Sequence, residues 1–460
     1  MRALAACLLV LLVAVAGPAV ARAQGPLVTT LDDNPISTPE LGVDALGGAV
    51  VAWLGFAPTT AAGGATTFVD SVHVSVRAPG GPFTAARPVS DLRTDVTRDL
   101  SLGMGRRGDA AVAWRAVQED AEKSPIIVSR RAPGADFTIP FPVDGSSGGR
   151  DASVAVGGEG SVLIAWLDGS GRRGCGSVVW AARARAGEPF GEARRISGSC
   201  ANASAAQAAL GPDGRGAVAW RARPSGGETE LQAAPLRNGR FARAREISRA
   251  PVSSVPFDIV GDRTGATIAW RDSGGNISAT GDVGRVLVAR VASGLETRPR
   301  VVAEGGRIAG PPRLAANAQG AALVVYEQAP ANRPLNRPSV LAARRTSLGG
   351  SFGLPQVVAA CGAADATATF AVPALNTAGG ATVAFQTGCG SELGIGPNLG
   401  LAVVTATSGG AWSAPIALSS GGYAVGTRMG AAEGGGAVAA WAERAFGSPQ
   451  AIEGIRAAVL

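Results

Sequence analysis

The chain has 460 residues, of which 46% are hydrophobic and 17% are charged, and its formal net charge is +7. The arginines that carry this charge are spread along the whole chain, which argues against a nucleic-acid-binding surface. With a single histidine, His73, the chain cannot build a zinc or iron site from several histidines, and we expect neither a metal nor a cofactor.

The first 23 residues have the pattern of a secretory signal peptide. Arg2 precedes an apolar run from Leu4 to Ala16, and Ala21-Arg22-Ala23 supplies the small residues expected before a cleavage site. We therefore expect a secreted, extracellular protein, monomeric, whose mature part is residues 24–460. No run of about 18 apolar residues follows the signal, so we expect no membrane span.

A short phrase recurs eight times along the mature chain: a Gly-rich turn, a run of small apolar residues and an aromatic residue. Consecutive aromatic residues are 50 to 61 residues apart, and self-similarity at such a period is typical of propellers and solenoids. The aromatic positions are Trp53, Trp114, Trp166, Trp220, Trp270, Tyr326, Phe385 and Trp441.

Each repeat contains several runs of strand length. Between residues 151 and 197, four runs (DASVAVG, SVLIAWL, SVVWAARA and FGEARRIS) are separated by turns rich in Gly and Pro, which predicts a four-stranded antiparallel meander. The run with the aromatic residue is apolar on both faces: Val50 and Ala52 point one way, Val51 and Trp53 the other. Such a strand needs cover on both sides, and blades stacked around an axis supply it.

A marker of the fourth strand also precedes the first full repeat. It reads RPVS at residues 87–90, RRIS at 194–197, REIS at 245–248 and IALS at 416–419, and NPIS occupies 34–37. Because the last repeat ends at Leu460 after its third run, the N-terminal segment can supply the missing strand.

These patterns predict an all-β, single-domain, eight-bladed β-propeller of four-stranded antiparallel blades, closed by an N-terminal strand that joins the last blade. A linear array with a free N-terminal segment is the alternative. The expected blades are residues 38–90, 91–144, 145–198, 199–248, 249–303, 304–359, 360–419, and 420–460 together with 24–37.

Four cysteines follow the signal peptide: Cys175, Cys200, Cys361 and Cys389. An even number in a secreted protein predicts disulfides. Cys175 and Cys389 follow second strands, Cys200 and Cys361 follow fourth strands, and these two kinds of loop emerge on the same face of a blade. We therefore predict the bonds Cys175–Cys200 and Cys361–Cys389. A metal site made of all four is the alternative, but the close CxxC spacing is absent.

Three repeats place an arginine directly after the aromatic residue: Arg115, Arg221 and Arg271. On a strand each points away from that ring, at the end that enters the loop face. Guanidinium groups suit ligands with carboxylate or phosphate groups, so these are possible contacts for an anionic ligand. Pairing with nearby acidic side chains, or solvation, is the alternative.

Carboxylates on the loop face offer a second chemistry, because a pair of them can hydrolyse a glycoside. Surface charge solvated by water is the alternative for each. His73 lies in an alternating third strand, where we expect a structural role, and we assign no catalytic residue. The acidic residues expected on or near the loop face are Glu119, Asp120, Asp168, Glu228, Asp272 and Glu327.

The segment from Thr407 to Pro415, followed by Leu418-Ser419, resembles the Asp-box repeat of sialidase-type propellers, although the Asp itself is missing. More broadly, the chain resembles secreted propeller-repeat proteins of actinobacteria that are rich in Ala, Gly and Arg. The sialidase resemblance implies an arginine triad and a tyrosine paired with a glutamate. Tyr326 occupies a repeated aromatic position, which leaves Tyr423, near Arg428, for that role.

No complete set of catalytic residues is present in the sequence. We therefore predict a non-catalytic extracellular scaffold that binds a polysaccharide or a protein on the loop face or in the central channel. A carbohydrate-active enzyme, glycosidase or lyase, with a carboxylate pair on the loop face is the alternative.

Overall fold

The computed structural model consists of β-strands throughout the part of the chain that it describes. Within that part no helix is found, and hence none long and apolar enough to cross a membrane. The described residues are 26–33, 35–60, 66–90, 95–96, 99–117, 124–169, 175–224, 228–248, 257–272, 283–292, 295–296, 298–330, 338–360, 366–389, 400–419, 423–444 and 452–460.

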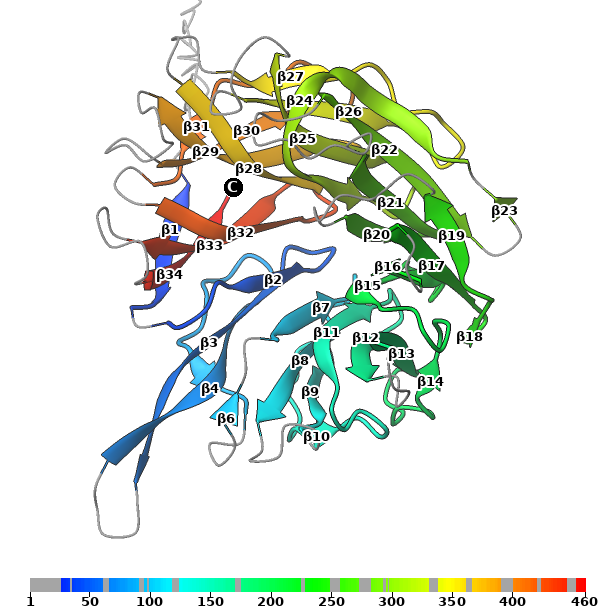
Figure 1. The fold of residues 1–460 in the computed structure, drawn as a ribbon. Helices are drawn as coiled ribbons and strands as arrows, with labels where there is room; N and C mark the ends of the chain where they lie inside the picture. Colours follow the sequence, from blue (N-terminus) through cyan, green and yellow to red (C-terminus); the bar gives the residue numbers. More distant parts are fainter. Residues whose placement is uncertain are drawn as a thin grey trace, which may run out of the picture.

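The strands form antiparallel sheets that stand around a common axis, as in a β-propeller (Figure 1). The first strand of each meander contributes residues to one axial cavity. These first strands are β2 (Glu40–Val43), β7 (Ser101–Met104), β11 (Arg150–Val156), β15 (Ser204–Leu210), β20 (Asp258–Asp262), β24 (Arg300–Ala316), β28 (Ala366–Leu375) and β32 (Tyr423–Ala431).

The second and third strands form the central pair of each meander. The second strands are β3 (Ala49–Thr60), β8 (Ala110–Val117), β12 (Val162–Gly169), β16 (Gly216–Ala222), β21 (Gly265–Asp272), β25 (Ala322–Pro330), β29 (Ala381–Cys389) and β33 (Ala437–Arg444). The third strands are β4 (Thr66–Arg77), β9 (Ile126–Arg131), β13 (Ser177–Ala184), β17 (Glu230–Arg237), β22 (Val283–Ala292), β26 (Ser339–Arg345), β30 (Gly400–Ala406) and β34 (Ile452–Val459).

Shorter strands complete most sheets at the outer edge. They are β5 (Arg87–Pro88), β10 (Phe141–Pro142), β14 (Arg194–Arg195), β18 (Arg240–Phe241), β19 (Arg245–Ser248), β27 (Gln356–Ala359) and β31 (Ile416–Ala417). Two further pieces, β6 (Asp95–Val96) and β23 (Leu295–Glu296), pair with β8 and β22.

One long strand joins two meanders into a single eight-stranded sheet. The first half of β24 pairs with β22 as an outer strand, and its second half pairs with β25 as an inner strand. Gly305 and Gly310 adopt positive φ values of 84° and 67°, which lets the strand bend between its two partners.

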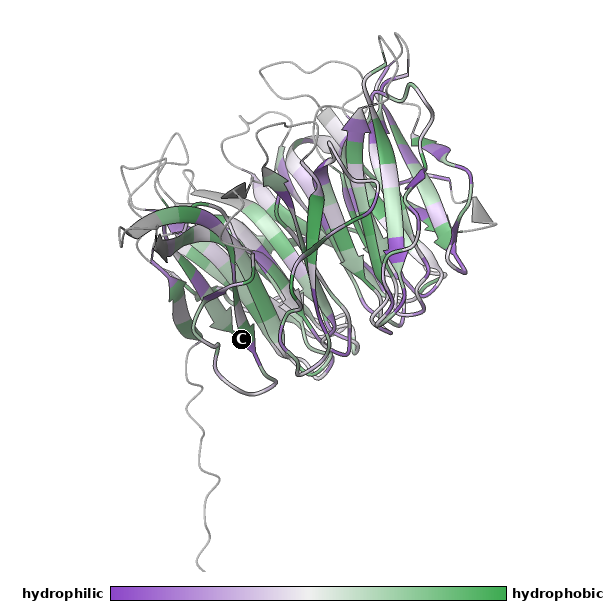
Figure 2. Cartoon of the chain, turned by 90° about the horizontal axis from the view of Figure 1, so that it is seen from below, coloured by the Kyte–Doolittle hydropathy of each residue, from purple (hydrophilic) through white to green (hydrophobic). Residues whose placement is uncertain are grey.

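The core consists of the interfaces between successive sheets. On β3, Ala52 and Leu54 pack with Val112 and Trp114 of the following sheet. Val51 and Trp53, on the opposite face of the same strand, pack with Ala440 and Ile455 near the end of the chain. The side view shows the hydrophobic residues concentrated along the strands (Figure 2). The predicted two-sided cover of the aromatic strand is therefore confirmed.

The repeated aromatic residues are the largest side chains in this core. Each is at most 2% exposed: Trp53, Trp114, Trp166, Trp220, Trp270, Tyr326, Phe385 and Trp441. Tyr326 is thus a core residue, as expected.

The serine that ends the outer-strand marker has a defined structural role. Its hydroxyl accepts a hydrogen bond from a backbone N–H of the third strand, one residue before the stretch with which the short outer strand pairs. Because a buried N–H without a partner is costly, this contact explains why the marker repeats. The pairs are Val72 with Ser90 (3.0 Å), Val179 with Ser197 (2.9 Å) and Leu401 with Ser419 (3.0 Å).

The N-terminal segment adds a strand to the last sheet, but it does so before the marker. Strand β1 (Leu27–Asp32) pairs with β34 in the order β1-β34-β33-β32. The described part of the marker, residues 35–37, instead contacts β3, where the N–H of Leu54 donates to Ser37 Oγ (2.8 Å). This part of the chain therefore bonds to a second strand and is not the added strand itself, which corrects the expectation at this position.

Candidate functional site: the axial cavity

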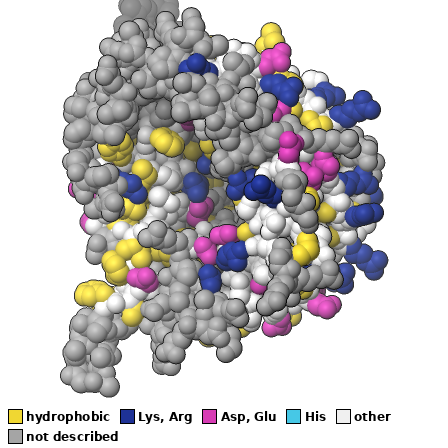
Figure 3. All heavy atoms as spheres, viewed as in Figure 1, with side chains coloured by type: hydrophobic (Ala, Val, Ile, Leu, Met, Phe, Trp, Pro, Cys, Tyr) yellow, Lys and Arg dark blue, Asp and Glu magenta, His cyan; other side chains and the backbone are white. Residues whose placement is uncertain are grey.

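Residues of the inner strands line an open cavity of about 740 Å³ near the common axis of the sheets. In the space-filling view, acidic and basic side chains lie next to one another in the middle of this face (Figure 3). The charged residues that line the cavity are Glu40, Asp99, Asp151, Arg221, Asp258, Arg313 and Arg428. Hydroxyl and amide groups of Ser101, Ser153, Ser204, Gln207 and Thr427 also line it.

Five inner strands carry an irregularity where they face the cavity. In each, the pairing register shifts and one residue has a left-handed backbone, as in a β-bulge. The left-handed residues are Asp151 (φ 51°), Ala205 (52°), Gly310 (67°), Phe370 (54°) and Gly426 (60°).

The bulges turn side chains toward the axis. Ser153, Gln207, Arg313, Val372 and Arg428 follow the five left-handed residues within three positions, and all line the cavity. Such a conformation costs a residue other than glycine about 1–3 kcal/mol and tends to occur at functional sites. The repeated bulge therefore makes the axial cavity the candidate functional site.

The cavity wall is held together by hydrogen bonds between successive inner strands. The N–H of Val154 donates to Ser101 Oγ, and the N–H of Ala208 donates to Ser153 Oγ, each at 3.0 Å. Farther round, Leu314 donates its N–H to Asp258 Oδ2 (2.7 Å). These bonds connect the sheets at the axis and hold the lining side chains in position.

Arg428 and Glu40 connect the last inner strand to the first. Arg428 Nη2 lies 2.7 Å from Glu40 Oε1, and its Nε lies 3.0 Å from Oε2, which is a two-pronged ion pair. Asp258 is half-buried, and the burial of its carboxyl raises its pKa, while the charges of Arg313 and Arg428 act in the opposite direction.

Two acidic residues of the cavity, Asp99 and Asp151, are in contact through the backbone of Asp151. The N–H of Asp151 donates to Asp99 Oδ2 over 3.3 Å. Burial raises the pKa of the Asp151 carboxyl, and the neighbouring charge of Asp99 raises it further, against the pull of Arg150 and Arg115.

Glu327 lies within β25, beside the bulge of β28 that borders the cavity. Its Oε1 accepts the N–H of Ala371 at 3.3 Å. Burial raises the pKa of Glu327 to about 7, and the nearby charge of Arg313 only partly opposes this.

The raised pKa of Glu327 predicts a pH-dependent stability. Folding shifts its pKa from 4.5 to about 7, so the native state binds a proton that the unfolded chain releases, and this contribution to the free energy of unfolding falls as the pH rises through that range. At pH 8, Glu327→Gln should therefore exceed the native protein in stability by about 1–2 kcal/mol, with little difference at pH 4. Urea denaturation at both pH values measures this. The exposed Glu228→Gln is the control, and an equal difference at both pH values would contradict the prediction.

The three predicted arginines have different neighbours in the structure. Arg221 lines the axial cavity. Arg115 lies near Asp151, whose pKa it lowers, and Arg271 Nη1 donates to the carbonyl of Ile308 at 2.6 Å. Each thus lies close to the inner strand of a sheet, and contact with an anionic ligand stays a prediction for all three.

The predicted carboxylates lie in separate surroundings. Asp272 is buried and pairs with Arg285, whereas Glu228 is exposed. Asp168 accepts the N–H of Gly169 (2.6 Å), and burial raises its pKa. Glu119 and Asp120 lie outside the described residues.

Three acidic residues of the cavity were missed in the sequence. They are Asp99, Asp151 and Asp258, and each precedes or begins an inner strand. A charged residue at the start of an apolar inner strand was the available signal. Among the described residues, no group of three or more His, Cys, Asp and Glu is placed to hold a metal. His73 is half-buried with Nε2 2.6 Å from Ser71 Oγ, in keeping with a structural role.

The disulfide Cys175–Cys200 is present and confirms the first predicted bond. It ties the loop after β12 to the connection that follows β14. Cys361 and the side chain of Cys389 lie outside the described residues, so the second bond stays a prediction.

Removing this disulfide should destabilise the protein. The bond closes a segment with a sequence separation of 25 residues, and Cys175→Ser with Cys200→Ser should cost about 3 kcal/mol through the greater freedom of the unfolded chain. Thermal unfolding, with and without a reductant, measures this. Reductant should lower the melting temperature of the native protein more than that of the double variant, and equal shifts in both would contradict the prediction.

Comparison with known proteins adds little about function. No family model matches the chain, and no curated protein matches it. Among solved structures, an ulvan lyase bound to an oligosaccharide has a TM-score of 0.44 at 11% identity, covering 80% of this chain and 94% of its own. An arabinanase of Penicillium chrysogenum has a TM-score of 0.39 at 10% identity, covering 95% of this chain and 98% of its own. A Hadza microbial sialidase has a TM-score of 0.37 at 11% identity, covering 94% of each chain. Since all three TM-scores are below 0.5, these similarities carry no information about function.

Proposed function

We propose that this protein is a secreted, non-catalytic scaffold that binds a saccharide in its axial cavity. The observation that carries the proposal is the cavity itself, whose volume of about 740 Å³ lies in the usual range of small-ligand sites, roughly 300–1,000 Å³. Its wall presents carboxylates, guanidinium groups and hydroxyls together. Hydroxyl groups of a sugar both donate and accept hydrogen bonds, so they match such a mixed wall.

We further propose that eight blades form a closed ring. Eight inner strands line the one cavity. The packing of Trp53 against the last sheet, the pairing of β1 with β34 and the Arg428–Glu40 ion pair all support closure. The disulfide supports an extracellular location, and the signal peptide over residues 1–23 and the likeness to actinobacterial proteins stay expectations.

Binding to immobilised glycans, followed by calorimetric titration of the best oligosaccharide, tests this function on residues 24–460. Arg221→Ala should weaken binding by about tenfold, the value of one charge-assisted hydrogen bond. Arg223→Ala, on the same chain segment but exposed, is the matched control and should leave affinity unchanged. Mass spectrometry of the bound sugar should show no product. Absence of binding, or an equal loss in both variants, would contradict the proposal.

A second function is favoured by the contact of Asp99 with Asp151. Two neighbouring carboxylates can divide the roles of acid and base in cleavage of a sugar chain. This is the enzyme alternative, with a pair in the cavity in place of one on the loop face. Turnover in the glycan experiment that Asp151→Asn abolishes would establish it and overturn the non-catalytic function.

A further inference from the structure

A second pocket, of about 380 Å³, lies between β22, the start of β24 and the turn that follows β26. Its lining shares no residue with that of the axial cavity. Four of its lining residues are arginines: Arg290, Arg298, Arg300 and Arg345. The described lining includes no carboxylate.

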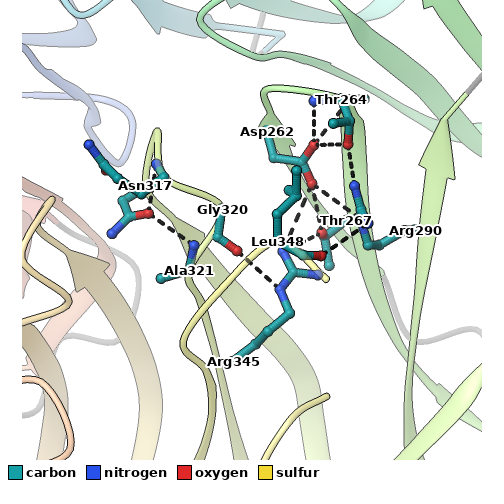
Figure 4. A network of polar contacts seen from close by, with 11 residues as sticks. Asp262, Thr264, Thr267, Arg290, Asn317, Gly320, Ala321, Arg345 and Leu348 are labelled. Carbon is teal, nitrogen blue, oxygen red and sulfur yellow. Dashed lines mark hydrogen bonds and ion pairs between the residues drawn. The ribbon is translucent and has the colours of Figure 1, made fainter. Parts of the chain in front are cut away.

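Two of these guanidinium groups share one buried carboxylate behind the pocket. Asp262 is fully buried, and its Oδ2 lies 3.6 Å from Arg290 Nε and 3.9 Å from Arg345 Nη2 (Figure 4). The Oδ1 of Asp262 accepts the N–H groups of Thr264 (2.8 Å) and Gly265 (3.0 Å). A single carboxylate offsets at most one positive charge, so the pocket has a net positive charge.

Arg345 is held rigidly in this position. Its Nε donates to the carbonyl of Gly320 and its Nη2 to Thr267 Oγ1, both at 3.2 Å. The guanidinium also lies 5.5 Å from the centre of the Phe352 ring. Burial, together with the charge of Arg290, lowers the pKa of Arg345 to about 10, so an anion placed here would stabilise the charged form.

The other two arginines are at the mouth of the pocket. Arg298 and Arg300 are exposed, and Arg300 Nη1 donates to Ser351 Oγ at 2.6 Å, which directs it toward the turn. Solvent-facing guanidinium groups at the mouth and buried ones behind can bind an anion from several sides.

A related pocket elsewhere in the fold differs from this one in having carboxylates in its lining. Arg130 Nη1 donates to the carbonyl of Glu188 (2.5 Å), much as Arg290 Nη1 donates to that of Leu348 (3.0 Å). The pocket beside Arg130 includes Asp109 and Glu188 among its lining residues, so its own carboxylates balance its arginines. The pocket beside Arg345 has the same framework without them.

We propose that this pocket binds an oxyanion group, a sulfate or phosphate ester, through Arg290, Arg298, Arg300 and Arg345. The planar forks of guanidinium groups match the several acceptor oxygens of such groups. The site goes beyond the saccharide cavity and does not depend on it.

Titration of residues 24–460 with sodium sulfate and with inorganic pyrophosphate, at an ionic strength held constant with chloride, tests this site by calorimetry and thermal shift. Arg298→Ala with Arg300→Ala should weaken binding by at least about tenfold, since both groups make charge-assisted hydrogen bonds. Arg194→Ala with Arg195→Ala, an exposed pair on β14, removes the same charge elsewhere and should change affinity less than about twofold.

A preference for sulfate would indicate a sulfated ligand and a preference for pyrophosphate a phosphorylated one, and either supports the site. No saturable binding of either probe, and no thermal shift, up to about 10 mM would overturn the proposed site, because a site built from four arginines should be occupied at that concentration. An equal loss of affinity in the two double variants would also overturn it.

Discussion

Replacing Trp220 with alanine should lower the free energy of unfolding by about 3–5 kcal/mol, the usual cost of emptying a buried aromatic site. Trp220 is fully buried and packs with Leu163, Val179 and Leu236 at the interface between two sheets. Because Trp220 fills the interface that both sheets share, its removal weakens the packing of both sheets at once. Urea denaturation followed by circular dichroism measures it.

The chain itself offers the control for this prediction. Phe385 occupies the same position in another repeat, so Trp220→Phe should fold and should lose only about 1–2 kcal/mol. Trp412 is only half-buried and lies below the guanidinium of Arg344, so Trp412→Ala should cost less than Trp220→Ala. Equal losses at Trp412 and Trp220 would show that the repeated position carries no special weight.

Replacing Asp262 with alanine should cost a similar amount, about 3–5 kcal/mol, because it leaves buried positive charge without its partner. Asp262 lies between Arg290 and Arg345, and it also accepts the backbone N–H groups of the turn at residues 263–265. The change therefore removes a countercharge and the acceptor of a turn together. Chemical denaturation at low and high salt measures the effect, which salt should restore only in small part since the site is buried.

An exposed ion pair provides the comparison for Asp262. Asp136 pairs with Arg87 at 2.5 Å, but its side chain is 80% exposed. Asp136→Ala should change the free energy of unfolding by less than about 1 kcal/mol, as is usual for surface pairs. If the two alanine variants were equally stable, the buried cluster would have no structural importance.

The repeat was the most predictive feature of the sequence. Apolar residues on both faces of the strand ending at Trp53 implied cover on both sides, and Ala52 and Val51 do contact opposite neighbours. The bond between Cys175 and Cys200 followed from loop type alone. The pairing of the N-terminal strand was predicted only approximately, because residues 35–37 of the marker-like segment bond to a second strand and do not form the added strand.

The candidate site was less accessible to sequence reasoning. Arg221 was singled out because it follows a repeated tryptophan, and it does line the cavity. Asp99 and Asp151 are 52 positions apart and meet only because two inner strands lie side by side at the axis. The bulges that turn Arg313 and Arg428 inward depend on backbone conformations that no repeated letter indicates.

The sequence by itself determined the local pattern: strand length, the apolar faces, the turns and the position of the buried aromatic residue. These depend on side-chain periodicity and on short-range backbone preferences, which neighbouring residues set. Tertiary structure alone decided which charges share a cavity, since Glu40 and Arg428 are separated by 388 positions and form one ion pair. It also decided that four arginines from two meanders line one pocket, because such proximity arises from packing at distances that the order of residues does not encode.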